Sequence, residues 1–280
     1  MSPPRLFVSD LDGTLAGHRA RLSPFTRRHL IALLDAGLPF TVASARSVHT
    51  LAPILAGLPL RLPIVEFNGA FITDLKTRQP LACHALGGDV AEVVLGWAVA
   101  IGVPPFVSTY VHAEQRLYPP IALVNAGIAW YDQNRRNAKD TRLRAAVDPR
   151  SLLDQSVICL TLIAKHSVLA PLAAAIAWSF PGQTQTLLYE NPYQPGWHWL
   201  TVQSSLASKA HALEAIAERA GVALRDTTVF GDEVNDISMF ERAGRGVAVE
   251  NAIPELKRIA HETIGPHHED SVVRYLLGAF

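Results

Sequence analysis

The chain has few cysteines and no excess of charge of either sign, and each shortage excludes a class of protein. Its two cysteines, Cys83 and Cys159, lie in apolar segments without metal-ligand spacing, which excludes a cysteine-rich zinc site or disulfide scaffold. We expect both to be buried, reduced thiols, with a single disulfide as the alternative. The 25 basic and 25 acidic residues are scattered, so no nucleic-acid surface or charged disordered tail is expected.

Long apolar runs, internal repeats and low-complexity tracts are missing as well. The most apolar stretch, residues 168–180, contains Pro171 and is too short to cross a bilayer. The first residues lack the basic and apolar segments of a secretory signal, so we expect a soluble, cytoplasmic protein without membrane contacts. The 280 residues, 49% of them hydrophobic, suffice for the core of one large domain or two modest ones.

Among the features that are present, the opening of the chain is the most informative. The apolar run at residues 6–8 is typical of a buried strand in a parallel sheet, and Asp10 and Asp12 follow it, with Gly13 permitting a sharp turn. In open parallel sheets the ligand crevice lies beyond the carboxyl ends of the strands. Two carboxylates this close repel each other unless a cation intervenes or one holds a proton. They therefore predict a metal site, or a nucleophile beside a proton-transferring group, with an aspartate-rich turn as the alternative.

Helical and extended patterns alternate after this strand. Ser23 and Pro24 predict the start of a helix that Gly37 ends. A strand, a helix and a second strand are then expected at residues 39–43, 48–55 and 63–67. This alternation is typical of a doubly wound, Rossmann-like parallel sheet, so we predict an α/β fold.

The alternation stops near residue 81 and returns near the end of the chain. The intervening segments are irregular and rich in proline and aromatic residues. Helices and strands are again expected at 208–220, 227–230, 237–242, 246–249 and from Pro254 onward. We therefore predict a core made from residues 1–81 and 196–280, with a second, smaller domain inserted at residues 82–195.

Polar groups follow further elements of the predicted core. Ser44 and Arg46 follow the second strand, where a hydroxyl and a guanidinium suit phosphate oxygens. Lys209 lies at the start of the helix after the insert, where a cation and backbone amides can both meet an anion. For each residue alone there is an ordinary alternative: the serine as a strand-end hydroxyl, and the arginine and the lysine as solvated surface cations.

A fourth polar group follows the strand at 227–230. Asp232, Asn235 and Asp236 place carboxylates and an amide there, as a hard, oxygen-seeking cation requires. Helix-capping acids are the ordinary alternative. Four such groups at equivalent positions of one sheet would be four coincidences, so we interpret them together as one active site.

The chain resembles the haloacid dehalogenase (HAD) superfamily of phosphohydrolases in four motifs: Asp10-Leu11-Asp12-Gly13-Thr14, Ser44-Ala45-Arg46, Lys209 and Gly231-Asp232-x-x-Asn235-Asp236. Asn68-Gly69 and the stretch at 247–252 extend the resemblance to the Cof-type sugar phosphatases of that superfamily. The resemblance covers residues 5–80 and 196–275. The insertion between the second and third motifs looks like the α/β cap that one class of the superfamily carries.

The resemblance implies a Mg²⁺-dependent phosphatase that acts on a sugar phosphate or a related small phosphorylated metabolite. It implies that Asp10 forms an aspartyl-phosphate and that Asp12 is the general acid and base. The phosphate-binding residues that it implies are Ser44, Lys209 and Asn235, with Arg46 contacting the substrate. The implied metal ligands are Asp10, Asp12 through its carbonyl oxygen, and Asp232. Asp236 is implied either to orient a metal-bound water, and so to belong to the metal site, or to orient Lys209.

Some positions depart from the family pattern. Ala45 and Ala210 stand where the family usually has glycine, and His267-His268 stand where it has an Asn-Asp stretch. The two histidines are either substrate contacts or a solvated loop. These departures concern rate and substrate more than the class of reaction.

Competing functions remain open at this point. A sugar phosphomutase needs the same nucleophile, and a non-catalytic sugar-phosphate-binding protein is a candidate from another class. The expected partner is a small phosphorylated metabolite, and the expected assembly is a monomer or homodimer. Aromatic and polar side chains of the insert either contact a sugar or form its core: Tyr110, His112, Trp130, Tyr131, Trp197, His198 and Trp199.

Overall fold

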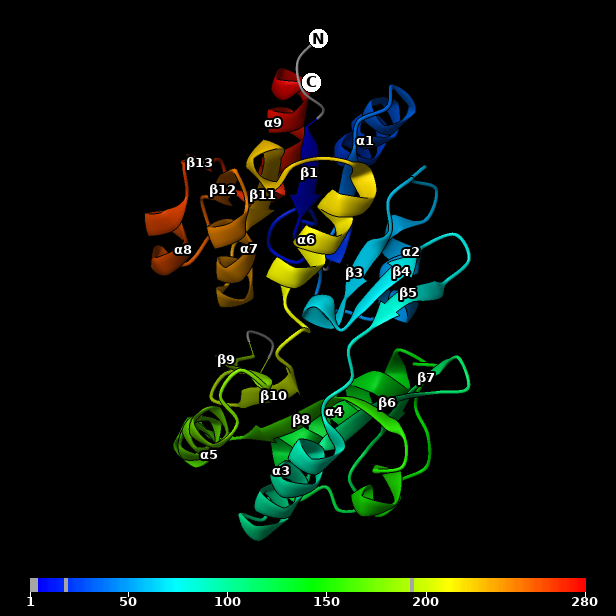
Figure 1. The fold of residues 1–280 in the computed structure, drawn as a ribbon, viewed down its shortest axis with the longest axis vertical. Helices are drawn as coiled ribbons and strands as arrows, with labels where there is room; N and C mark the ends of the chain where they lie inside the picture. The colour runs from blue at the N-terminus through cyan, green and yellow to red at the C-terminus, as the bar shows by residue number, and fades with distance from the viewer. Residues whose placement is uncertain (1–4, 18–19, 192–193) are drawn as a thin grey trace. The chain divides into compact units, whose positions relative to one another are not determined.

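The computed structural model describes residues 5–17, 20–191 and 194–280, so the expectation about a secretory signal falls partly on residues outside the description. The chain forms two compact units (Figure 1). The first unit comprises Met1–Cys83 and Ser208–Phe280, and the second comprises His84–Ala207. Within the described ranges, no helix combines the length and the apolar character needed to cross a membrane.

A five-stranded parallel sheet forms the centre of the first unit. Its order is β13-β12-β11-β1-β2, with β1 at Leu6–Ser9, β2 at Phe40–Val42, β11 at Thr227–Gly231, β12 at Arg245–Val249 and β13 at Glu262–Ile264. Leu6 of β1 pairs with Thr227 of β11, so the two halves of the chain meet in the middle of the sheet. The predicted parallel α/β core is therefore confirmed, and the carboxyl ends of its strands lie at one edge.

Six helices flank this sheet in the described part of the unit. They are α1 (Pro24–Asp35), α2 (Val48–Leu55), α6 (Lys209–Ala220), α7 (Ile237–Arg242), α8 (Pro254–Ile259) and α9 (Ser271–Ala279). The start of α1 is capped as predicted, because the Ser23 hydroxyl accepts from the backbone N–H of Thr26 at 2.9 Å. Helix α6 ends at Gly221, which adopts the left-handed conformation with φ 65°.

The third predicted strand differs from expectation. It is β3 (Ile64–Glu66), and it pairs antiparallel with β4 (Phe71–Asp74), which pairs with β5 (Gln79–Cys83). Its link to the parallel sheet is one parallel bridge between Ala43 and Val65. The connection from β3 to β4 is a short turn at 67–70, whereas a parallel pair needs a crossover of roughly a dozen residues. Cys83 is exposed at the end of β5, so only Cys159 is buried as predicted, and both are free thiols.

A five-stranded antiparallel sheet forms the second unit, in the order β7-β6-β8-β10-β9. Its strands are β6 (Phe106–Val111), β7 (Glu114–Tyr118), β8 (Ser156–Ala164), β9 (Thr184–Glu190) and β10 (His198–Ser204). Helices α3 (Gly88–Ala100) and α5 (His166–Ser179) pack on the face that carries Leu162 and Leu200. Helix α4 (Ala126–Asn137) packs on the face that carries Ile163 and Trp199. The insert is thus an α/β unit with helices on both faces.

The predicted return to the core at residue 196 is wrong. Strand β10 pairs antiparallel with β8 and with β9, so residues 198–204 are part of the second unit's sheet. Pro195 and Gly196, which flank the predicted boundary, lie in the turn between β9 and β10. The first unit resumes at Ser208, where α6 begins.

Candidate active site

A buried ion network lies at the carboxyl edge of the parallel sheet. Asp10 follows β1, Asp236 follows β11, and Lys209 is the first residue of α6. The Lys209 ammonium donates to Asp10 Oδ1 and to Asp236 Oδ1, both at 2.5 Å, and its side chain is fully buried. Burial opposes the charge of Lys209, but Asp10 and Asp236 outweigh it and raise its pKa above the ordinary value. The lysine is therefore a fixed positive charge between two carboxylates.

Asp232 is held beside this network by the turn after β1. The Thr14 hydroxyl donates to Asp232 Oδ1 at 2.6 Å. Gly13, between Asp12 and Thr14, has φ +79°, and a Cβ there would overlap the Asp232 carboxylate. A side chain at position 13 would therefore be strained and would displace the acid. The Gly-Thr pair of the first motif thus serves to position an acid more than 200 residues away in the chain.

Three carboxylates converge at this edge with a geometry that fits a divalent cation. One oxygen each from Asp10, Asp232 and Asp236 lies within 4.8 Å of the others, and no other such group of possible metal ligands occurs among the described residues. All three side chains are buried, and the Lys209 ammonium contacts two of them, Asp10 and Asp236. Carboxylate oxygens are the donors that Mg²⁺ takes in proteins. The donor set therefore fits Mg²⁺.

Burial and neighbouring acids raise the pKa values of two of these acids. Burial raises the pKa of Asp10 well above its ordinary value, Lys209 opposes this, and Asp236 and Asp232 add to it. Burial and the nearby Asp236 raise the pKa of Asp232 to about 7, with the hydrogen bond from Thr14 opposing. A cation among these oxygens would stabilise their ionised forms.

The carboxylate of Asp12 makes a separate interaction. The Arg46 guanidinium donates from Nε to Asp12 Oδ2 at 2.6 Å and from Nη2 to Asp12 Oδ1 at 2.8 Å. The two side chains are 30% and 40% exposed. Asp12 is therefore more accessible than Asp10, and Arg46 fixes the direction of its carboxylate. The sequence predicted crowding of Asp10 with Asp12, but the carboxylate of Asp12 lies outside the buried acid group.

The segment that carries Ser44 is fixed by β3. The Ser44 N–H donates to the Val65 carbonyl at 3.0 Å, and the Asn68 N–H donates to the Ser44 carbonyl at 3.0 Å. Ser44 is buried, and its hydroxyl accepts from the Arg46 N–H at 3.2 Å. The backbone of Ser44 is thus anchored to β3 and to the turn that follows it.

Asn68 connects that strand to the loop after β11. Its side-chain oxygen accepts from Asn235 Nδ2 at 2.9 Å, and its backbone has φ 57°. Gly69, with φ +116°, approaches the backbone of Ser208 so closely that a Cβ would overlap it. The turn after β3 thus contacts both the loop of Asn235 and the start of α6.

The two adjacent histidines differ in their contacts. The His267 N–H donates to Asn251 Oδ1 at 3.1 Å, and the His267 ring nitrogen Nδ1 lies 2.8 Å from that oxygen. Asn251 Nδ2 in turn donates to the Gly13 carbonyl at 2.8 Å. His267 is therefore connected, through Asn251, to the turn that bears Asp12. The structure gives His268 an edge-to-face contact with the His267 ring.

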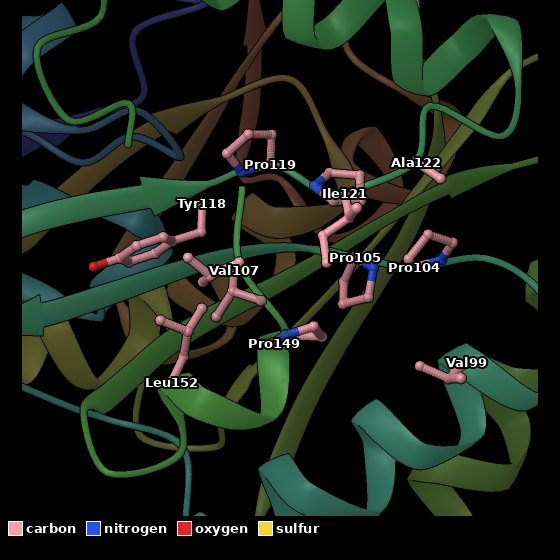
Figure 2. A pocket seen from close by; sticks show the side chains of 12 residues that line it. Val99, Pro104, Pro105, Val107, Tyr118, Pro119, Ile121, Ala122, Pro149 and Leu152 are labelled. Atoms are coloured by element: carbon pink, nitrogen blue, oxygen red, sulfur yellow. The ribbon is translucent and has the colours of Figure 1, made fainter. Parts of the chain in front are cut away.

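Aromatic residues of the second unit include core residues. Trp199 is buried and meets Trp130 and Tyr131 edge to face, with ring centroids 6.2 and 6.1 Å apart. A separate hollow of about 170 Å³ in this unit is lined almost entirely by proline and aliphatic side chains, with the hydroxyl of Tyr118 turned away from them (Figure 2). This hollow offers no group that could act as an acid, a base or a nucleophile.

Two buried residues, one in the site and one on β3, have no role assigned in the sequence analysis. Thr14 belongs to the first motif, and its hydroxyl donates to Asp232; its place directly after Gly13 was the available signal. Glu66 is completely buried, and its carboxylate accepts from the Val48 N–H at the start of α2 and from the Thr73 hydroxyl. A lone acid in an apolar strand, Pro63 to Phe67, was the available signal for Glu66.

Comparisons with known proteins agree with this geometry. Residues 7–276 match the family described as haloacid dehalogenase-like hydrolase. The 5-amino-6-(5-phospho-D-ribitylamino)uracil phosphatase YitU of Bacillus subtilis (strain 168) is 26% identical over 274 residues, which are 98% of this chain and 96% of that protein. An HMP-PP phosphatase of Yersinia pseudotuberculosis serotype O:1b is 26% identical over 276 residues, covering 97% of this chain and 94% of that one.

Solved structures share the fold. A haloacid dehalogenase-like hydrolase from Bacteroides thetaiotaomicron superimposes with a TM-score of 0.79 at 22% sequence identity, over 99% of each chain. The similarity extends through both units, so the insert is part of the shared architecture.

Proposed function

This chain belongs to the haloacid dehalogenase-like hydrolases and is a phosphoric monoester hydrolase, and we propose that it acts on a small phosphorylated metabolite in a Mg²⁺-dependent reaction through an aspartyl-phosphate. The observation that carries the proposal is the buried group of Asp10, Asp232 and Asp236 around Lys209. A protein that only bound its ligand would gain nothing from three desolvated acids, whereas phosphoryl transfer uses them to hold a nucleophile and a cation.

Asp10 is the proposed nucleophile. One of its oxygens accepts from Lys209, which fixes the carboxylate, and the other attacks phosphorus. As the new bond to phosphorus forms, the bond from phosphorus to the leaving oxygen breaks, and Asp12 gives that oxygen a proton. Water then attacks the phosphorus of the aspartyl-phosphate, Asp12 takes its proton, and phosphate and free Asp10 result.

Ser44, Lys209 and Asn235 are the proposed phosphate-binding groups. Support comes from their anchoring: the Ser44 backbone is bound to Val65, and the Asn235 amide is oriented by Asn68. Groups held in place before the substrate arrives stabilise the transferring phosphoryl group without reorganisation. Arg46 is the proposed substrate contact, and its bidentate pair with Asp12 supports a further part in orienting that acid.

Asp10, Asp232 and Asp236, together with the carbonyl oxygen of Asp12, are the proposed holders of Mg²⁺. The cation would offset the combined negative charge of the substrate phosphate and the Asp10 carboxylate. Lys209 provides the permanent part of that compensation, because it is fixed between Asp10 and Asp236 in the protein itself.

The class of substrate rests on the relatives. Their names specify a phosphorylated ribitylaminouracil and HMP-PP, so a small phosphorylated metabolite is the proposed substrate here. We further propose that the second unit selects among such metabolites, since the proposed catalytic residues all belong to the first unit. Assembly as a monomer or homodimer and a cytoplasmic location remain predictions.

The test of this proposal is phosphate release from a panel of phosphomonoesters, measured with Mg²⁺, with EDTA, and with Mg²⁺ restored. We expect EDTA to abolish turnover and Mg²⁺ to restore it, because the acid group requires a cation to bind a phosphate dianion. Asp232→Asn should raise the Mg²⁺ concentration needed for half-maximal rate, whereas Asp35→Asn, at an exposed position of α1, should not. Full turnover in EDTA would contradict the proposal.

A further inference from the structure

A second hollow, lined mainly by polar side chains, lies in the first unit at the amino ends of β1, β11 and β12. Its volume is about 270 Å³, and it is lined by Arg5, Phe7, Arg225, Asp226, Thr227, Thr228, Arg245 and Tyr275. These three strands are neighbours in the sheet (Figure 1). Tyr275 belongs to α9. Arg5 precedes β1 and Asp10 follows it, so at about 3.3 Å per residue the hollow is roughly 16 Å from the acid group. It is therefore separate from the proposed active site.

The charge of this hollow is unbalanced. Arg245 donates from Nη2 to Glu262 at 2.7 Å and from Nε to the Tyr275 hydroxyl at 3.1 Å. Arg225 has a loose contact with Asp226, at 3.8 Å, and is 85% exposed. Arg5 is exposed, and the described residues offer its guanidinium no hydrogen-bond or ion-pair partner. Three guanidinium groups thus face two carboxylates.

The donors around the hollow suit an anion with several oxygens. Guanidinium forks match the oxygens of phosphate and donate to two of them at once. The Tyr275 hydroxyl accepts from Arg245 and so keeps its own proton for a further acceptor. Thr228, which pairs with both Phe7 and Arg245 across the sheet, adds a hydroxyl at the centre of the three strands. Asp226 is the one carboxylate in the lining, and its weak contact with Arg225 is the interaction that an anion would replace.

We propose that this hollow is a second anion site, which binds a phosphate-bearing small molecule away from the catalytic residues. The hollow has room for several water molecules, each of which takes about 30 Å³ in the liquid, so a phosphate with a small organic group attached is the proposed ligand. Inorganic phosphate and a phosphomonoester share the chemistry that the arginines recognise. The inference goes beyond the proposed function and does not depend on it, because the two sites share no residue.

Calorimetric titration of the full chain with inorganic phosphate, in EDTA at constant ionic strength, tests the proposal. Without a cation, the acid group of Asp10, Asp232 and Asp236 offers a phosphate dianion no divalent charge to offset its own, so binding under these conditions reports the arginine site. The test variant is Arg5→Gln/Arg225→Gln, and the matched control is Arg61→Gln/Arg78→Gln, which removes two exposed arginines elsewhere in the same unit. A parallel titration with phenylphosphonate asks whether an organic group adds affinity.

The wild-type protein and the control should bind phosphate with the same affinity within about twofold. The test variant should bind at least about tenfold more weakly, since it loses charge-assisted hydrogen bonds. Tighter binding of phenylphosphonate would assign the site to organic phosphates, and equal binding would assign it to inorganic phosphate. Arg225→Gln alone repeats the test if the double variant is unstable. Absence of binding by the wild type, or equal binding by the test variant, would overturn the proposal.

Discussion

At the scale of single residues, the two aspartates of the first motif have opposite surroundings. Asp10 is 8% exposed and contacts a fully buried lysine, whereas Asp12 is 40% exposed and pairs with a partly exposed arginine. A buried, fixed carboxylate suits in-line attack, and a more accessible one suits proton exchange with a leaving group and with water. The difference in burial supports the different roles that we propose for them.

Replacing Asp12 should separate the two chemical steps. In Asp12→Asn, we expect steady-state turnover to fall by about 10²–10⁴-fold, because the general acid and base is lost. p-Nitrophenyl phosphate should still give a burst of nitrophenol, since this leaving group departs without a proton. An alkyl phosphate should give no burst of its alcohol, because that leaving group needs the proton that Asp12 supplies. Rapid-mixing measurements of both substrates check this. Turnover close to that of the wild type with both substrates would show that Asp12 is not the acid and base.

The sequence predicted which residues meet but not how their side chains pair. Asp10, Ser44 and Asp232 each follow a short apolar strand, and the parallel arrangement of those strands brings them to one edge. Lys209 comes to the same edge at the start of α6. The pairing of Arg46 with Asp12 could not be predicted, because spacing along the chain does not determine the direction of a long side chain.

At the scale of elements, the turn after β3 connects the parts of the site. Gly69 lies against the backbone of Ser208, the residue that caps α6, and Lys209 follows directly. A close approach of two backbones at this point requires a residue without a Cβ, and the positive φ requires the same. The position of Lys209 therefore depends on a turn that belongs to a different sheet.

Gly69→Ala should impair both stability and turnover. The added Cβ would be strained at φ +116° and would overlap backbone atoms, which cannot rotate away, so α6 and Lys209 must shift. Gly37→Ala is the matched control, because Gly37 has φ +97° but nothing within 4 Å of the new Cβ. Urea denaturation should give a larger loss for Gly69→Ala, and its kcat should fall while that of Gly37→Ala stays near the wild-type value. Equal effects of both substitutions would contradict the role of the close approach.

Elements with local signals were predictable and those defined by distant pairing were not. Ser23 and Gly221 delimit helices whose ends agree with the prediction, because capping is a property of neighbouring residues. Strand β10 was assigned to the wrong domain, since its membership depends on pairing with β8, more than 30 residues earlier. The sequence around Pro195 and Gly196 indicates a turn but not the partner of the strand that follows.

At the scale of the whole molecule, each unit has its own apolar core. The core of the first unit includes Leu6, Val229 and Val247. The core of the second unit consists of two apolar clusters, one with Leu160 and one with Trp199. The residues proposed for catalysis come from both halves of the chain but from the first unit alone. The inserted residues 84–207 therefore contribute no strand to the parallel sheet and none of the polar side chains at its carboxyl edge.

Exchanging residues 84–207 for the corresponding unit of another haloacid dehalogenase-like hydrolase should alter substrate preference. We expect the order of kcat/KM among phosphorylated metabolites to change, because the proposed selecting unit has been replaced. Hydrolysis of p-nitrophenyl phosphate should persist, since Asp10, Asp12, Lys209 and Asp232 are unchanged. If both activities fell by the same factor in every folded chimera, the second unit would be part of the catalytic machinery.

The most direct test of the account is identification of the phosphorylated residue. The protein would be mixed with Mg²⁺ and p-nitrophenyl phosphate, quenched in acid within the first turnover, and its peptides analysed by mass spectrometry. The account predicts a phosphoryl group on Asp10 in the wild type and in Asp12→Asn, and none in Asp10→Asn, because Asp10 carries the attacking oxygen. A phosphoryl group on another residue, or one trapped on Asp10→Asn, would contradict it.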